Sequence, residues 1–470
     1  MYRSIAFVSI AVVLAGCAVG PNYQRPPVQV PSRFRGPAGT TSATTPTRLA
    51  DMKWWEVFHD EQLQQLIRTG LARNYDLRDA VAHVEAARAN LGITRSNQYP
   101  NVAASGDVNL TRLSRNGSFP LPESFVRSQN RNWGQAGLNL LSFEVDIWGR
   151  LRRATEAARA NLLNAEDTRK AVVTTLVSDV ATSYFTLREL DYELAISART
   201  LSTRRESLDL TRLRQTGGVA TELDLRQSEQ LVYTASETIP AIQQQIEQTE
   251  NQISLLLGEN PGPIARGRDL VSQELPEVPA GLPSALLERR PDILAAEEAL
   301  IAANAQIGVA RAAYFPQISV SGFLEGQSTQ LSSLFSGPHS AWNFVPQVTQ
   351  PIFAAGRLGS TVKLAQAQRE SAVAQYEKAI QTAFTEVSNA LSAHQHLRES
   401  RLEQEKLVVA LENRTRLAYA RYRGGVDTQL DALDADRDLF QAQIGLSQLR
   451  LNELLSVVQL YKALGGGWQS

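Results

Sequence analysis

The sequence Gly424-Gly425-Val426-Asp427-Thr428-Gln429-Leu430-Asp431 separates two long segments that are rich in Ala, Leu, Gln, Glu and Arg. The stretch from Gly217 to Asp224 has the same GGV start and the same Leu-Asp ending, and it also lies between two long segments of this kind. Residue 424 follows residue 217 by 207 positions, and residue 431 follows residue 224 by the same 207. A repeat at a fixed distance indicates duplicated structural units. We therefore predict two helical hairpins, with turns at Gly217-Gly218 and Gly424-Gly425.

Composition favours long helices packed side by side. The chain has 470 residues and a net charge of −1, with 43% hydrophobic but only 7% aromatic residues. A nearly neutral charge gives no indication of a nucleic-acid surface. Helical periodicity predicts helices over 61–95 with a pause near 73–76, and then over 150–215, 222–257, 292–311, 358–423 and 428–464. Pro240 removes an intrahelical hydrogen bond, so a kink or break is expected within the helix that contains it.

The apolar period changes from 3.6 to 2 after Tyr99-Pro100 and again after Phe315-Pro316. Alternation predicts strands over 102–111, 141–147, 317–325 and 342–353, with loops over 114–132 and 326–341. Each strand would have one apolar and one polar face. A soluble antiparallel sheet shows the same alternation as a membrane barrel, so the strands alone leave both open.

The N-terminus has the features of a bacterial targeting segment. Arg3 precedes an apolar run over 5–13 that is too short to span a bilayer. The run ends in Leu14-Ala15-Gly16-Cys17, which resembles the lipobox of lipoproteins, and Cys17 is the only cysteine. We expect acyl chains on Cys17, with a buried thiol as the alternative. Ala18 follows this cysteine, which in such lipoproteins implies delivery to the outer membrane.

The expected domain organisation follows from the repeat. It consists of a signal peptide (1–16), a lipid-anchored extended leash (17–48), a first structural repeat (49–257), a connector or equatorial region (258–283), a second repeat (284–464) and a C-terminal tail (465–470). After the signal peptide, the sequence has no run of about 18 consecutive apolar residues, so strands would have to cross any membrane.

Four strands per chain cannot close a membrane barrel, because the smallest bacterial barrels have about eight strands. Three chains would supply 12 strands and six helical hairpins, which could pack as a tube. An ordinary helical bundle is equally compatible with the helical periodicity.

Several stretches together carry a family resemblance: Val19 to Tyr23, Trp54-Trp55 with Phe58, Glu144 to Arg150, Leu287 to Ile293, and Leu460 to Trp468. On these residues the chain resembles the TolC-like outer-membrane factors of tripartite efflux pumps, in the lipoprotein branch that serves resistance-nodulation-division exporters. The resemblance covers essentially all of the chain after the signal peptide.

The resemblance implies a mixed α/β membrane protein, mostly α-helical, with an internal duplication. It implies a homotrimeric 12-stranded outer-membrane β-barrel, continued by a long α-helical periplasmic barrel. The implied function is the exit channel of a tripartite efflux pump for drugs or other small molecules. Its partners would be a periplasmic adaptor (membrane fusion protein), an inner-membrane transporter and outer-membrane lipid. A lipid-anchored periplasmic coiled-coil adaptor without a channel is the alternative, and it would not need four amphipathic strands.

Four residues match tip positions that line the periplasmic gate in this family: Leu430, Asp431, Asp434 and Asp224. Threefold copies of Leu430 would form an apolar ring, and threefold copies of Asp434 an acidic ring that favours cations. The alternative is that the acids Asp427, Asp431, Asp434, Asp436 and Asp438 only stabilise a helix N-terminus through the macrodipole. We prefer this alternative for Asp427 and Asp436.

We expect neither an enzyme nor a cofactor. His394 and His396 lack the i, i+4 spacing of a metal pair, and surface histidines are the better interpretation. The acids at 434, 436 and 438 have the spacing of a calcium loop, but Leu439 occupies the position of its turn glycine. The sequence has no phosphate loop, nucleophile elbow or paired-cysteine metal signature.

Overall fold

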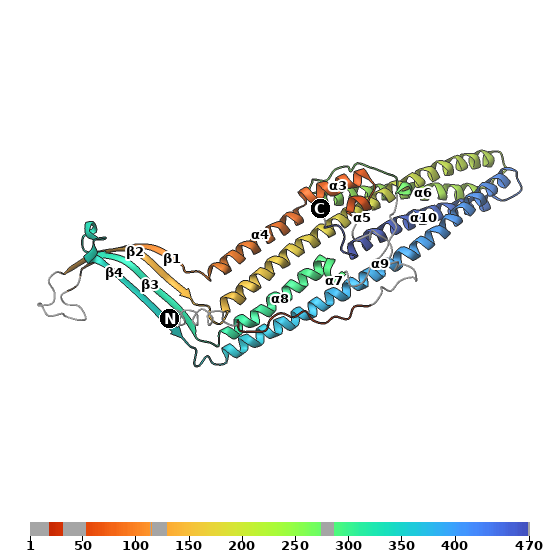
Figure 1. Cartoon of the computed structure of the whole chain (residues 1–470). Helices are drawn as coiled ribbons and strands as arrows, with labels where there is room; N and C mark the ends of the chain where they lie inside the picture. Colours follow the sequence, from red (N-terminus) through yellow and green to blue (C-terminus); the bar gives the residue numbers. More distant parts are fainter. Residues whose placement is uncertain (1–17, 32–52, 113, 115–128, 274–285, 469–470) are drawn as a thin grey trace. The chain divides into compact units, whose positions relative to one another are not determined.

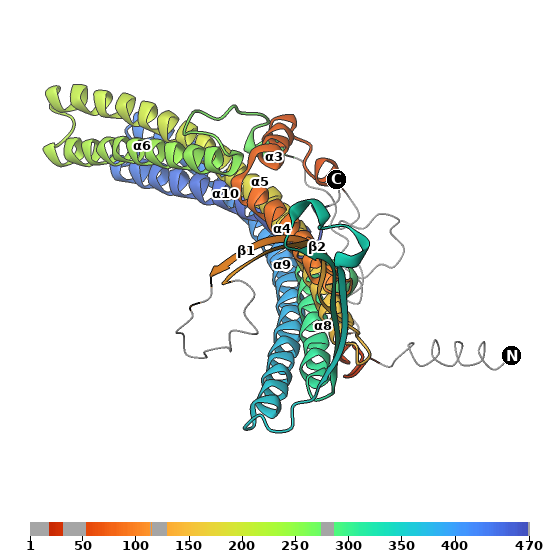
Figure 2. The ribbon, with the colours of Figure 1, turned by 90° about the vertical axis from the view of Figure 1, so that its left-hand side faces the viewer.

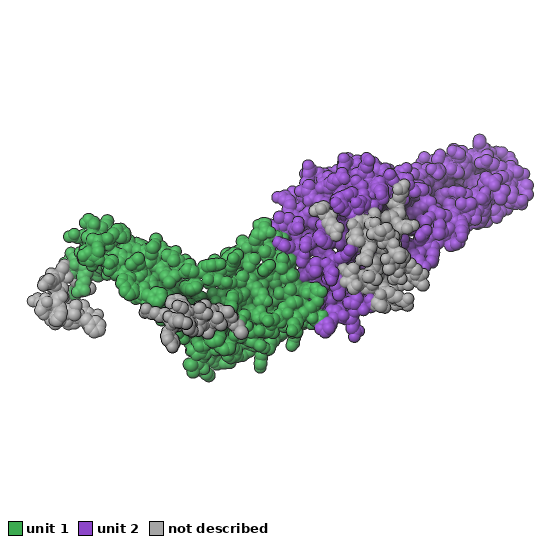
Figure 3. Space-filling model, in the orientation of Figure 1, with its two compact units in different colours: residues 1–26, 84–164, 296–375 green, residues 27–83, 165–295, 376–470 purple. Residues whose placement is uncertain are grey.

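The computed structural model describes residues 18–31, 53–112, 114, 129–273 and 286–468. The signal peptide, Cys17 and most of the expected leash lie outside these ranges. The chain divides into two compact units, one of residues 1–26, 84–164 and 296–375, the other of residues 27–83, 165–295 and 376–470 (Figure 3). We describe each unit by itself.

The main helices and strands follow the same order in the two halves of the chain (Figure 1). The first half contains α2 (Trp54–Val57), α3 (Glu61–Arg73), α4 (Tyr75–Ser96), β1 (Val102–Arg112), β2 (Asn130–Glu144), α5 (Arg150–Thr216) and α6 (Glu222–Leu257). The second half contains η3 (Leu270–Ser272), α7 (Leu286–Arg289), α8 (Pro291–Ala312), β3 (Gln317–Ser328), η5 (Leu331–Ser333), η6 (Gly337–His339), β4 (Ser340–Thr349), α9 (Arg357–Arg423) and α10 (Gln429–Ala463). Both α5 and α9 have 67 residues. The expected internal duplication is confirmed.

Some of the expected boundaries are wrong. Pro240 does not break α6, which is continuous from Glu222 to Leu257. The buried side chains of Ala235 and Ile242 hold the helix on both sides of the proline, so packing outweighs one lost hydrogen bond. Strand β2 begins at Asn130, within the expected loop, and ends at Glu144. Strand β4 begins at Ser340 and ends at Thr349, where its pairing with Gln317 at the start of β3 ends, so the expected end at residue 353 is wrong.

The first unit contains a four-stranded antiparallel sheet in the order β1-β2-β3-β4 (Figure 1). The register brings Ala104, Leu138, Leu324 and Trp342 into one row across all four strands. Successive side chains of a strand point to opposite faces, so this row and the rows two residues away share one face. The neighbouring row on the other face contains Ala103, Asn139, Phe323 and Asn343.

Helix packing in the first unit depends on small residues. Ala157 and Ala160 of α5 pack on Ala302 and Ala305 of α8. Helix α8 is long and apolar enough to cross a membrane, with a mean hydropathy of 1.3, but 56% of that window is buried, which also fits a core helix. The chain from Ala18 to Arg25 is extended and packs on the fold.

The N-terminal contacts explain that packing. The amide of Val19 donates to the carbonyl of Trp148 (3.0 Å). Asn304 of α8 donates to the carbonyl of Pro21 (2.9 Å), and Arg25 pairs with Glu297. These residues of the expected leash are therefore bound to the fold.

The core of the second unit is aromatic where α3, α5 and α10 meet. Phe58 contacts the rings of Phe185 and Tyr461, with centroids 6.0 and 6.3 Å away. Asp60 caps α3 and accepts a hydrogen bond from Tyr184 (2.9 Å). Burial opposes ionisation of Asp60, but hydrogen bonds from Gln273, Tyr184 and backbone amides keep its pKa below the ordinary value. Helices α5, α6 and α10 continue side by side beyond this core (Figures 1 and 2).

Candidate gate at the hairpin tips

The two Gly-Gly turns have the same backbone structure. Gly218 has φ of 75° and Gly425 has φ of 72°, in the left-handed region that favours glycine. At the end of α5, the amide of Val219 donates to the carbonyl of Arg214 (2.8 Å). The corresponding hydrogen bond at the end of α9, from the amide of Val426 to the carbonyl of Arg421, is 3.0 Å long. Both helices thus end in a Schellman motif, which satisfies their last carbonyls and reverses the chain.

The return helices begin with a threonine and an aspartate. The amide of Thr221 donates to the Asp224 carboxylate (2.7 Å), and the amide of Asp224 donates to Oγ1 of Thr221 (3.2 Å). In the second hairpin, Oγ1 of Thr428 donates to the Asp431 carboxylate (2.7 Å). Two of the four predicted gate residues, Asp224 and Asp431, therefore make hydrogen bonds at the starts of α6 and α10.

Leu430 and Asp434 lie one helical turn apart on α10, and therefore on the same side of that helix. The Leu430 side chain is 50% exposed. Asp434 pairs with Arg437 at 3.1 Å, in a contact that is open to solvent on both sides. The nearby Asp427 accepts two hydrogen bonds from Arg421, which hold the pKa of this carboxyl below its ordinary value. The tip thus combines an exposed leucine with acids whose partners lie within the same hairpin.

A buried ion pair joins the two hairpins just behind the tips. Nε of Arg204 on α5 lies 2.7 Å from the Asp436 carboxylate on α10, and the two side chains are only 3% and 9% exposed. Arg204 also donates to the carbonyl of Leu231 on α6 (3.0 Å), and its guanidinium lies over the ring of Phe440. Asp436 is therefore a link between hairpins, and its interpretation as a helix N-terminal acid is wrong.

Gln429 forms a second link. Its amide nitrogen donates to Oγ1 of Thr211 on α5 (2.9 Å) and to the hydroxyl of Ser228 on α6, while its side-chain oxygen accepts from Tyr422 (3.3 Å). Gln429 is 5% exposed, so these hydrogen bonds are protected from water. Sequence reasoning missed this group, because neutral polar residues on a helix carry no signal of burial.

The structure gives no support for metal chemistry in the part of the chain that it describes, where no group of three or more His, Cys, Asp or Glu side chains could hold an ion. His394 is half-buried and contacts Ser456 (3.1 Å), so it is not the surface histidine that we expected. Burial lowers the pKa of His394. The predicted lipid-attachment residue, Cys17, lies outside the described residues.

Comparisons with known proteins identify the fold. The model of the outer membrane efflux protein family matches residues 66–259 and 282–466. The probable efflux pump outer membrane protein TtgC of Pseudomonas putida is 41% identical over 471 residues, which covers 100% of this chain and 96% of that protein. The cation efflux system protein CusC of Escherichia coli is 36% identical over 463 residues, with 98% of each chain covered. The open state of the Neisseria gonorrhoeae MtrE outer membrane channel matches with a TM-score of 0.85 at 32% identity, covering 96% of this chain and 99% of that one.

These matches confirm the expected fold class, the function in efflux across the outer membrane, and the location in that membrane. The relatives are named as efflux and channel proteins rather than as enzymes. Both the family model and relatives more than 30% identical cover most of the sequence, and this chain therefore belongs to the outer membrane efflux protein family.

Proposed function

We propose that this protein is the exit channel of a tripartite efflux pump, and that it works as a homotrimer with a gate at the tips of its helical hairpins. The apolar face of the four-stranded sheet carries this proposal. In the row that crosses all four strands, Leu138 is 53% exposed, Leu324 60% and Trp342 76%. A soluble sheet would bury such a face against a core, whereas a barrel strand turns it to lipid.

The two outer strands support the trimer. Strands β1 and β4 each pair with one neighbour within the chain and are exposed along almost their whole length. Unpaired strand edges cannot lie in the hydrocarbon of a bilayer. If β4 of one copy pairs with β1 of the next, three copies close a barrel of twelve strands. The polar face, which includes Asn139 and Asn343, would then line the pore.

The helical hairpins would form the periplasmic part of the channel, where they would meet a periplasmic adaptor and an inner-membrane transporter. Leu430, Asp431, Asp434 and Asp224 would then surround the narrow end. Because Asp434 has only an exposed partner, three copies would attract cations and could separate at little cost. TtgC and CusC are named for efflux pumps, the latter for cations. We propose that small molecules leave through this channel and that it catalyses no reaction.

A lipid-anchored periplasmic adaptor is the second candidate. It would use the two helical hairpins but would have no need for an apolar sheet face in contact with lipid. The exposed row that ends in Trp342 therefore favours the channel.

The decisive experiment measures the mass and the conductance of the detergent-extracted protein. We expect a trimer that forms conducting channels in planar bilayers. A charge on the lipid face, Leu324→Arg, should prevent insertion, whereas Asn343→Arg on the other face should still insert. A water-soluble monomer without conductance would refute the channel. Cys17→Ser, checked by mass spectrometry, should carry no acyl chains; acyl chains on this variant would contradict lipid attachment at Cys17.

A further inference from the structure

The two strand-to-helix junctions of the first unit differ in charge although they are related by the repeat. At the junction of β2 and α5, Arg150 donates two hydrogen bonds to Glu144, at 2.8 and 2.5 Å. Asp146 accepts from the backbone amides of Leu151 (3.1 Å) and Arg152 (2.9 Å). Both carboxylates of this junction are therefore fully engaged, and its arginine is neutralised.

At the junction of β4 and α9, the same positions lack both acids. Pro351, Phe353 and Arg357 stand 207 residues after Glu144, Asp146 and Arg150. The arginine is kept, but neither of the other two side chains can accept a hydrogen bond. Within the described residues, the Arg357 guanidinium has no ion pair or hydrogen bond. One junction is thus neutral and the other has a cation with all five N–H donors available.

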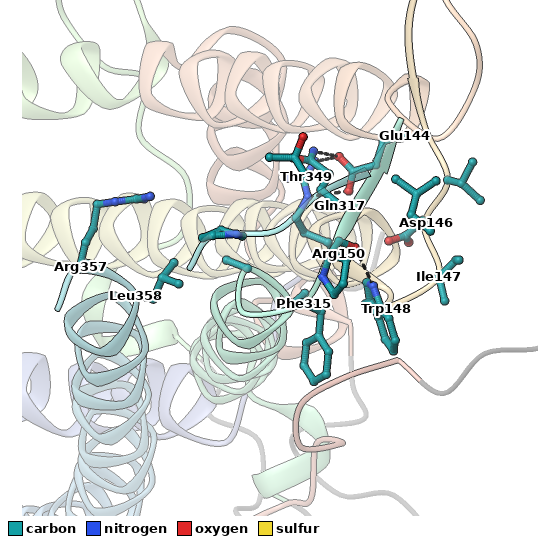
Figure 4. A pocket seen from close by; sticks show the side chains of 16 residues that line it. Glu144, Asp146, Ile147, Trp148, Arg150, Phe315, Gln317, Thr349, Arg357 and Leu358 are labelled. Atoms are coloured by element: carbon teal, nitrogen blue, oxygen red, sulfur yellow. Dashed lines mark hydrogen bonds and ion pairs between the residues drawn. The ribbon is translucent and has the colours of Figure 1, made fainter. Parts of the chain in front are cut away.

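Arg357 lines a cavity of about 310 Å³ between the two junctions. Glu144, Asp146 and Arg150 line the same cavity, together with Phe315 and Thr349. In Figure 4, Arg150 and Gln317 point toward Glu144, whereas Arg357 stands apart at the start of α9. Gln317 of β3 also donates to Glu144 at 2.5 Å, so that carboxylate accepts three hydrogen bonds, two of them from Arg150. The acids of the cavity are therefore already satisfied, and the net attraction is for an anion near Arg357.

Two large apolar side chains precede this cation in the chain. In the connection between β4 and α9, Ile352 is 91% exposed and Phe353 is 89% exposed. The segment that begins at Ala18 contacts the β2–α5 junction, because a Cβ on Gly149 would lie only 2.7 Å from Cβ of Ala18. Ala18 is next to Cys17, so an acyl chain there would enter the bilayer close to that junction. An arginine beside exposed Ile and Phe suits the boundary between head groups and acyl chains.

We propose that Arg357 and the cavity beside it bind the phosphate of a membrane phospholipid, whose acyl chains cover Ile352 and Phe353. The phosphate takes the place that Glu144 occupies against Arg150 in the first junction. Arginine suits this role because its planar group donates two parallel hydrogen bonds to a phosphate. A water-soluble phosphate would satisfy the cation but would leave both apolar side chains in water, so we assign the site to a lipid. The assignment rests on the proposed location of the strands in the outer membrane.

The test is a titration of the complete, detergent-purified protein with phosphatidylglycerol, followed by native mass spectrometry. We expect one lipid per copy of the chain and an affinity about tenfold lower for Arg357→Gln, the usual effect of one charge-assisted contact. Lys363→Gln is the matched control, since it removes one exposed cation from the same helix outside the cavity. It should leave the affinity unchanged. Diacylglycerol, which lacks the phosphate, should bind about equally weakly to the original protein and to Arg357→Gln.

A second variant keeps the test decisive if Arg357→Gln folds poorly. Pro351→Glu combined with Phe353→Asp recreates the acids of the first junction, so it should fold as a trimer and lose lipid binding about tenfold. Unchanged lipid affinity in this variant or in Arg357→Gln would overturn the proposal. Displacement of the lipid by glycerol phosphate at equal concentration would overturn the lipid assignment. A trimer that conducts but binds no phospholipid would refute this inference alone, whereas absent trimers and absent conductance would refute the proposed function.

Discussion

Replacing Asp436 by asparagine should loosen the hairpin tips far more than replacing Asp434. The Arg204–Asp436 pair is nearly inaccessible to water, with side chains 3% and 9% exposed. Removing one partner of a buried pair leaves an unpaired charge and costs about 3 kcal/mol or more. The Asp434–Arg437 pair is 40% and 56% exposed, and its loss should cost less than about 1 kcal/mol. Asp434→Asn is therefore a matched control one half-turn away.

Hydrogen–deuterium exchange measures this difference locally. If about 3 kcal/mol is lost at the tips, amides near Arg204 and Asp436 should exchange about 100-fold faster, because 1.4 kcal/mol corresponds to a factor of ten. Asp434→Asn should change exchange there by less than about fivefold. The double variant Arg204→Met with Asp436→Leu should restore protection, since apolar side chains can replace a buried ion pair. Equal exchange in Asp436→Asn and the original protein would refute the idea that this pair holds the hairpins together.

Three further predictions concern the acids of the proposed gate, a buried carboxyl group and a residue with positive φ. Asp431→Ala with Asp434→Ala removes the acids of the proposed gate and should raise ion conductance in planar bilayers; an unchanged conductance would contradict the gate. Burial raises the pKa of Glu189 from an ordinary value of 4.5 to about 7, so the folded state holds this proton more tightly than the unfolded chain. Stability should therefore fall as pH rises from about 4.5 to 7, and Glu189→Gln should abolish that part of the fall in melting temperature. Ala355 has φ of 46°, the only positive value at a non-glycine residue among those described. Ala355→Gly should therefore stabilise the protein by roughly 0.5 kcal/mol, measured by thermal unfolding. A lower melting temperature of this variant would show that the position is unstrained.

The sequence predicted the helices well because their ends depend on local chemistry. Helix α6 begins after the cap at Thr221 and ends before Gly258, which has φ of 69°. Both signals can be recognised from a few neighbouring residues. The strand ends were harder to predict, because pairing between strands sets them. Strand β2 extends back to Asn130 since that residue lies opposite Arg112 of β1, although its own sequence is typical of a loop.

The residues of the candidate gate were also only partly predictable from the sequence. Asp224 and Asp431 could be found because they repeat next to the glycine turns. The partner of Asp436 could not, because Arg204 lies 232 residues earlier in the chain and nothing in its neighbourhood distinguishes it from an arginine on a helix surface. Long-range pairing of this kind depends on which helix faces meet. Periodicity predicts which face of a helix is buried, but not which other helix packs against that face.

Comparison of the repeats explains why the tips pack asymmetrically despite identical turns. Glu222 and Gln429 occupy the same position after the two glycine pairs, 207 residues apart. The Glu222 side chain is 60% exposed and pairs with Arg226, whereas Gln429 is 5% exposed and joins α10 to the first hairpin. Likewise, Leu411 stands in the second repeat where the first has Arg204. The turns therefore follow from residues that both repeats keep, but contacts between the hairpins depend on positions where the repeats differ. A gate built on such positions can be loosened by one substitution without unfolding either turn.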